Sequence, residues 1–175
     1  MELRKEIEPD FETAEKLYPE VLRLILNYTN YCDENGDEDN TEYTKLENVL
    51  HKMTGKDISQ FNLWEWWEEE GAENLAFDIS LPNPKQVNGV THSELNEIIR
   101  RIKNYEESNE DDNSFKSNFY NYTIFGNSYF NKFLELNFKT YDYKLFQRNK
   151  NKQGNYFEYS QSEVVEKIWN NGNYK

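Results

Sequence analysis

Two aromatic stretches in the last third of the chain decide the fold class: "FYNYTIF" (residues 119–125) and "FLELNF" (residues 133–138). In the second stretch Leu134, Leu136 and Phe138 occupy every other position. Such alternation is typical of a β-strand that buries one face. We therefore predict that both stretches are strands of a mostly antiparallel sheet.

Two further segments extend this predicted sheet. Residues 75–81 place Leu75, Phe77, Ile79 and Leu81 at alternate positions, which indicates another half-buried strand. Residues 143–159 alternate aromatic and polar residues around a glycine at 154, as in a β-hairpin.

The rest of the chain carries the three-to-four-residue spacing of amphipathic helices. We expect helices over residues 10–31, 43–53, 57–70, 91–105 and 160–172. Pro19 predicts a kink or a new helix start, and the spacing of Thr91 with Glu94 and of Ser160 with Glu163 predicts capping boxes. The predicted fold class is α+β: a helix-rich N-terminal portion packed on a mostly antiparallel β-sheet, with a C-terminal helix.

Charge is distributed unevenly along the 175 residues, whose net charge is −13. Residues 1–113 hold 11 Lys and Arg against 28 Asp and Glu, whereas residues 114–175 hold 9 against 5. We expect one domain over residues 1–175, with a helical acidic part to about residue 105, an acidic loop at 106–114 and an aromatic, mildly basic part at 115–175. Such asymmetry is informative about binding partners rather than about fold.

The remaining composition predicts a cytoplasmic protein that does not enter a membrane. The N-terminus lacks the apolar stretch of a signal peptide, and no apolar run is long enough to span a bilayer. Cys32 is the single cysteine and ends an apolar run, so we expect a buried structural thiol in a reducing compartment.

Patterns for metal binding and catalysis are incomplete in this sequence. The loop "DENGDEDNTEYT" (residues 33–44) resembles a calcium loop, but Glu38 stands where that loop needs glycine and Thr44 where it needs glutamate. Glu65 and Glu69 lie four residues apart and are interpreted as a solvated helix face rather than an acid–base pair. We expect no metal, no cofactor, no catalytic residue and no enzymatic activity, with weak incidental cation binding by the loop left open.

The stretch "LWEWWEEEGAE" (residues 63–73) contains three of the four tryptophans. On a helical wheel Trp64 and Trp67 fall on the apolar face, while Trp66 lies beside that face, near acidic residues. Trp66 is then either an anchor for a partner or a residue that packs under a neighbouring loop, and the sequence favours neither.

These features lead to a ranked set of functional hypotheses. The first is an acidic inhibitor that binds a basic protein partner, either as an immunity protein against a nuclease-type toxin or as a phage anti-defence mimic of nucleic acid. The predicted partner-binding residues are acidic or aromatic: Asp33, Asp37, Glu38, Asp39, Trp66, Glu69 and Glu70.

The alternative hypothesis is a nucleic-acid-binding module that uses the 143–159 hairpin, where cations lie among aromatic rings. Its predicted contact residues are Lys144, Arg148, Lys150, Lys152 and Tyr156. A scaffold or subunit without a separate activity, and an enzyme with a carboxylate pair, are the remaining readings.

Overall fold

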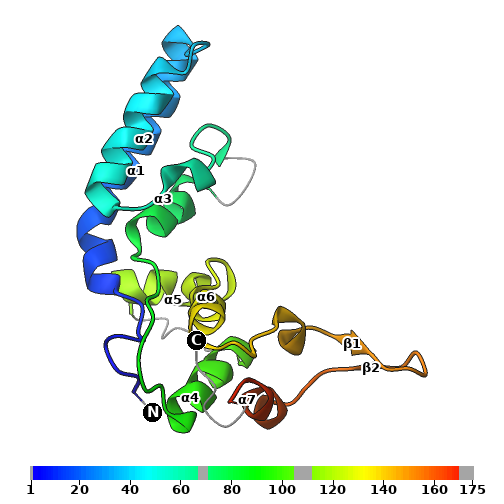
Figure 1. Ribbon diagram of the computed structural model, residues 1–175. Coiled ribbons are helices and arrows are strands. Elements are labelled where there is room, and N and C mark those ends of the chain that lie inside the picture. The colour runs from blue at the N-terminus through cyan, green and yellow to red at the C-terminus, as the bar shows by residue number, and fades with distance from the viewer. Residues whose placement is uncertain (1, 67–70, 105–111, 170–175) are drawn as a thin grey trace. The chain divides into compact units, whose positions relative to one another are not determined.

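The chain forms two compact units in the computed structural model, which describes residues 2–66, 71–104 and 112–169 (Figure 1). Unit 1 comprises residues 1–9 and 83–175, and unit 2 comprises residues 10–82. The expectation of one domain over residues 1–175 therefore stays a prediction. Most of the predicted acidic loop at 106–114, together with Trp67, Glu69 and Glu70, lies outside the described residues.

Unit 2 is built on a helical hairpin. Helix α1 (Phe11–Asn35) and helix α2 (Thr41–Thr54) lie side by side, joined by a short loop at Gly36–Asn40 (Figure 1). The helix predicted at 10–31 is confirmed, but one continuous helix runs through Pro19. One core cluster of the unit is aliphatic with one tyrosine and one thiol: Val21, Ile25, Tyr28, Cys32, Leu46, Leu50, Ile58, Leu63, Ala76 and Ile79.

The strand predicted at 75–81 is wrong, because these residues belong to helix α3 (Ala72–Ser80), which packs against α1. Ala72 and Ala76 are both buried, one helical turn apart, and their small side chains allow the two helix backbones to approach. A strand with Phe77 and Ile79 on its buried face would have exposed Ala76. A short apolar run fits both the two-residue period of a strand and the 3.6-residue period of a helix. Residues 72–80 form the helix.

Unit 1 contains four α-helices among its described residues: α4 (His92–Lys103), α5 (Phe115–Phe125), α6 (Tyr129–Asn137) and α7 (Gln161–Trp169). The capping box of α4 is confirmed, since Thr91 accepts from the Glu94 N–H and Glu94 accepts from the Thr91 N–H. Helix α7, the predicted C-terminal helix, packs against α4.

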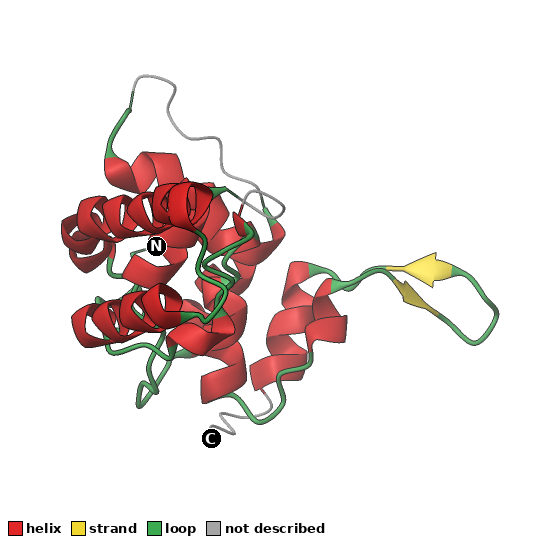
Figure 2. Ribbon diagram, turned by 90° about the horizontal axis from the view of Figure 1, so that it is seen from above, coloured by secondary structure: helices red, strands yellow, loops and turns green. Residues whose placement is uncertain are grey.

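The two stretches that defined the predicted sheet are helices α5 and α6, so the α+β fold class is wrong. The buried side chains of α6 are Tyr129, Phe130, Phe133, Leu134 and Asn137, and the last four recur at helical steps of three and four residues. Leu136, expected in the core, is 36% exposed. Figure 2 shows a mostly helical chain whose strands, in the described residues, form one small ribbon.

That ribbon is the predicted hairpin, although its strands are short. Strand β1 (Asn149–Lys150) pairs antiparallel with strand β2 (Tyr156–Phe157), and Gly154 lies in the turn with a positive φ of 85°. A short 3-10 helix, η3 (Tyr143–Phe146), precedes it. The hairpin extends away from the helices of unit 1 (Figures 1 and 2).

Candidate functional site

The predicted acidic residues of unit 2 gather at the end of the α1–α2 hairpin. Asp33 lies in the last turn of α1, and Asp37, Glu38 and Asp39 lie in the loop that follows. Asp33, Glu38 and Asp39 are exposed, and Asp37 is half-buried. We call these four residues the acidic tip.

Asp37 differs from the other three because its carboxylate organises the loop. It accepts hydrogen bonds from the backbone N–H groups of Glu42 (3.1 Å) and Tyr43 (2.8 Å), at the start of α2, and from the hydroxyl of Tyr28 (3.2 Å). Burial would raise the pKa of Asp37, but these hydrogen bonds to the charged form outweigh it and lower that pKa below its usual value. Asp37 therefore positions the exposed carboxylates beside it.

A pocket of about 370 Å³ opens beside the acidic tip. Its walls combine aromatic rings, carboxylates and loop backbone: Tyr28, Gly36, Asp37, Glu38, Asn40, Tyr43 and Trp64. The Tyr28 ring meets the rings of Tyr43 and Trp64 edge to face, with centroid distances of 5.7 and 6.0 Å. The fold thus brings the acidic loop and the tryptophan-rich stretch together at one site.

The indole at this site is Trp64, whereas Trp66 lies against the core. Trp64 is 37% exposed. Trp66 is half-buried, and its indole N–H donates to the Thr29 hydroxyl oxygen at 3.0 Å. Trp66 thus contacts helix α1, whereas the packed reading placed it under a neighbouring loop, and a role as an anchor for a partner stays a prediction.

The helix expected at 57–70 is not formed over its described residues. This explains why Trp64, expected on the apolar face, is exposed, while Trp66 packs against the core. A 3-10 turn, η1 (Ile58–Gln60), is followed by bends at Phe61, Leu63 and Trp64. The Asn62 side-chain oxygen accepts from the N–H groups of Trp64 (3.2 Å) and Glu65 (3.1 Å). Such side-chain competition for backbone donors turns the chain, so a helical wheel does not describe these residues.

The calcium-like loop does not assemble as a metal site in the described part of the chain. There, no group of three or more His, Cys, Asp or Glu side chains is arranged to hold a metal ion. Asp33 projects from a helix while Asp37 is engaged by backbone donors, so these two carboxylates serve different local structures. Cys32 is buried, as predicted.

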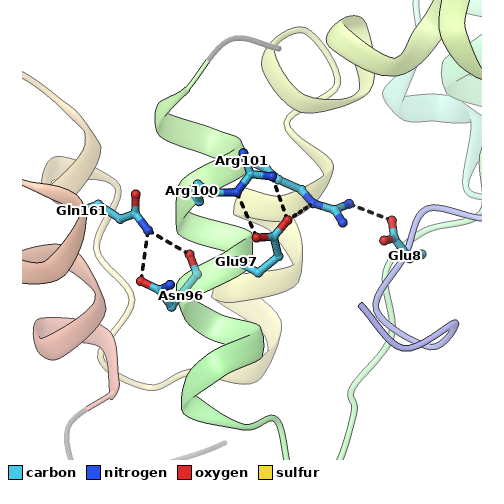
Figure 3. Close-up of polar contacts among 6 residues, drawn as sticks. All are labelled: Glu8, Asn96, Glu97, Arg100, Arg101 and Gln161. Atoms are coloured by element: carbon cyan, nitrogen blue, oxygen red, sulfur yellow. Dashed lines mark hydrogen bonds and ion pairs between the residues drawn. The ribbon is translucent and has the colours of Figure 1, made fainter. Parts of the chain in front are cut away.

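A network of buried charges in unit 1 was not predicted (Figure 3). Glu97, which is 5% exposed, accepts from Arg100 (2.9 Å) and from Arg101 (2.9 Å) on the same helix, α4. Arg101 also donates to Glu8 at 2.9 Å. Burial would lower the pKa of Arg101, but the hydrogen bonds to Glu8 and Glu97 raise it above its usual value.

This network joins the N-terminal segment to helix α4. It fixes the N-terminal segment on α4, where Arg4 also pairs with Glu94 at 2.6 Å. A pocket of about 600 Å³ near it includes Arg101 in its wall, but that cation is already engaged by two carboxylates. Glu97 and Arg101 lie four residues apart on one helix, so the sequence could have indicated their ion pair. The contact between Arg101 and Glu8 could not be read from the sequence, because the two residues are far apart along the chain.

The second predicted site, the 143–159 hairpin, is also assembled. Lys144, Arg148, Lys150 and Lys152 are all exposed, and Tyr156 is 58% exposed. The Arg148 guanidinium and the Lys150 ammonium lie 4.5 and 5.1 Å from the centroid of the Tyr156 ring. Three residues of the alternative hypothesis, Arg148, Lys150 and Tyr156, are therefore brought together.

Comparison of the chain with protein-family models, with curated proteins and with solved structures gives no match. Among the described helices, none combines the length and apolar character that a membrane span requires.

Proposed function

We propose that this protein is an acidic inhibitor that binds a basic protein partner through the acidic tip. The partner class is a nuclease-type toxin or a defence effector whose nucleic-acid-binding groove is basic. The observation that carries the proposal is that the half-buried carboxylate of Asp37, the exposed carboxylate of Glu38 and the exposed indole of Trp64 line one pocket. The overall charge of −13 supports the same partner class.

Two physical effects favour this mode of binding. Clustered carboxylates steer a basic protein toward the acidic tip and raise its association rate, an effect that salt weakens. A partly buried tryptophan in a polar surround is a common anchor of protein interfaces. The tip thus supplies both long-range attraction and a short-range apolar contact.

The pocket extends the proposal to the chemistry of the partner's anchoring side chain. Its aromatic walls, Tyr28, Tyr43 and Trp64, attract a cation through their ring faces, and Asp37 and Glu38 add negative charge. A Lys or Arg side chain of the partner can interact with the aromatic rings and with the carboxylates at the same time. We therefore assign the pocket to a basic side chain at the centre of the interface.

The test is capture from an extract of the native host on the immobilised protein, first at low salt and then at high salt. The informative variant neutralises the exposed acidic tip with Asp33→Asn, Glu38→Gln and Asp39→Asn, and a second variant is Trp64→Ala. The matched control removes the same charge elsewhere with Glu2→Gln, Glu6→Gln and Glu15→Gln, all at exposed positions.

Under the proposal, a basic nuclease or effector is captured by the wild-type protein and by the matched control, and high salt elutes it. Neither the acidic-tip variant nor Trp64→Ala captures it. Addition of the wild-type protein then inhibits the activity of that purified nuclease. Capture of nucleic acid alone, or equal capture by the tip variant and its control, would falsify the proposal.

A further inference from the structure

The 143–159 hairpin exposes aromatic rings that a folded protein ordinarily covers. Tyr143 is 56% exposed, Tyr156 58% and Phe157 37%. Exposed aromatic side chains with polar neighbours often mark binding sites. The hairpin belongs to unit 1, so this surface is separate from the acidic tip of unit 2.

The strand register places the key side chains on one face of the ribbon. Lys150 is the cross-strand partner of Tyr156, and Arg148 is two residues before Lys150. Residues two apart on a strand share a face, and directly opposed residues across an antiparallel pair share it as well. Arg148, Lys150 and Tyr156 therefore form one cationic and aromatic face.

In the part of the chain that the structure describes, the cations of this hairpin have no carboxylate partners. Within the described residues, none of Lys144, Arg148, Lys150 and Lys152 makes an ion pair, although the chain has 33 acidic residues. Glu158 is the single acidic residue in the 143–159 sequence. The hairpin thus presents net positive charge in a protein whose total charge is strongly negative.

The turn of the hairpin is held in place by a side chain. The Asn151 side-chain oxygen accepts from the N–H groups of Gln153 (3.0 Å) and Asn155 (2.9 Å), and the Asn151 N–H donates to the Asn155 carbonyl at 2.9 Å. Gly154 adopts a positive φ that other residues rarely adopt. These contacts present the face of the ribbon in a defined geometry.

We propose that this hairpin binds single-stranded nucleic acid. Tyr156 stacks on an unpaired base, while Arg148, Lys150 and the flanking Lys144 and Lys152 contact backbone phosphates. Stacking on an aromatic ring requires a base face that is not covered, which a duplex does not offer except at its ends. An acidic protein would satisfy the cations but would give the exposed rings no flat partner.

The acidic residues elsewhere do not prevent this binding at moderate salt. Repulsion between exposed charges is largely screened beyond about 10 Å at 0.1 M salt. The proposal goes beyond the inhibitor role, because it uses other residues and a ligand of opposite charge.

The direct test is fluorescence anisotropy of a labelled oligothymidylate of about 10 nucleotides, a length within the site sizes of single-strand-binding folds. The expected result is saturable binding that weakens with salt. For the four phosphate contacts proposed, the slope of log K against log salt concentration is expected to be about −3.

Four variants separate stacking from charge. Tyr156→Ala is expected to weaken binding roughly 5- to 150-fold, whereas Tyr156→Phe retains it, because the ring alone supplies the stacking face. Lys150→Gln weakens binding. It also makes the slope of log K against log salt concentration shallower, by the amount expected for the loss of roughly one phosphate contact. Lys85→Gln is the control, because it makes the same charge change at an exposed position outside the hairpin. It is expected to leave the affinity and the salt slope unchanged.

Three results would overturn the proposal. The first is absence of binding at low salt by a protein whose circular dichroism shows it to be folded. The second is equally tight binding of polyphosphate or polyglutamate, which would indicate an electrostatic or acidic-protein site. The third is full binding by Tyr156→Ala. The tip variant Asp33→Asn, Glu38→Gln and Asp39→Asn retains oligonucleotide binding, so failure of this proposal is distinguishable from failure of the inhibitor proposal.

Discussion

The hydroxyl of Tyr28 donates a hydrogen bond to Oδ2 of Asp37 across 3.2 Å, and this contact joins the buried side of α1 to the acidic loop. Asp37 also accepts the backbone donors at the start of α2. One carboxylate therefore satisfies helix-terminal donors that would otherwise have no partner in the protein. The acidic tip owes its defined geometry to this residue.

Asp37→Ala is expected to lower the free energy of unfolding by about 1 kcal/mol, the usual effect of losing a helix-capping side chain. Urea denaturation followed by far-ultraviolet circular dichroism measures this change. Asp33→Ala, at an exposed position of α1, is the control and should alter stability by roughly 0.5 kcal/mol or less. Equal effects of the two substitutions would argue against the capping role of Asp37.

The buried pairing of Glu97 predicts acid sensitivity. Hydrogen bonds from Arg100, with a further contribution from Arg101, lower the pKa of Glu97 from 4.5 to about 2. Because the folded-state pKa is depressed, the stabilisation is fully present above about pH 4.5 and is lost as the pH falls toward 2. The loss is expected to reach up to about 3 kcal/mol, measured by urea denaturation across this range.

Glu97→Gln removes the titrating group and should flatten the dependence of stability on pH in that acidic range. At neutral pH this variant is also less stable than the wild type, because it takes one carboxylate from the buried Arg101. An unchanged acid slope in Glu97→Gln would show that Glu97 is not the group responsible.

The two described indoles of the tryptophan-rich stretch are expected to respond differently to truncation. Trp66→Ala should cost roughly 2–3 kcal/mol of stability, because the ring packs on the core of unit 2 and donates to Thr29. Trp64→Ala should cost about 1 kcal/mol or less, since the ring is 37% exposed and lies at the rim of the pocket against Tyr28. Chemical denaturation compares the two variants, and a reversed order would contradict the structure.

Leu134 and Leu136 provide a direct test of whether residues 129–137 are a helix. Leu134→Ala is expected to cost about 2–5 kcal/mol because the side chain is fully buried. Leu136→Ala should change stability by roughly 0.5 kcal/mol, since that side chain is exposed on the helix. A strand would bury both side chains on one face, so similar losses for the two would refute the helical assignment.

The start of helix α4 was predictable from the sequence because its capping box is a local interaction. Thr91 and Glu94 lie three residues apart, and the reciprocal hydrogen bonds that they form need no information from the rest of the chain. The choice between helix and strand at residues 129–138 was not local. Phe130, Phe133 and Leu134 fit a helical stripe, while Leu134, Leu136 and Phe138 fit an alternating strand, and only packing against the rest of unit 1 separates these patterns.

The two candidate sites differed in predictability for the same reason. Arg148, Lys150 and Tyr156 are close in sequence, and a hairpin brings them together through its register alone. Asp37 and Trp64 are far apart in sequence, and they meet because Tyr28 contacts both of them. The sequence therefore indicated an acidic loop and a tryptophan-rich stretch, but not the pocket that they share.

The single cysteine has a practical consequence for the thermodynamics of this protein. Cys32 is buried in unit 2, next to the helical turn that carries Tyr28, so a thiol-modifying reagent reacts only when that region opens. The rate of alkylation thus reports the opening equilibrium of unit 2 alone, in the same way that amide exchange reports local unfolding. Set beside the global denaturation curve, this rate shows whether the two units unfold as one cooperative body or one after the other.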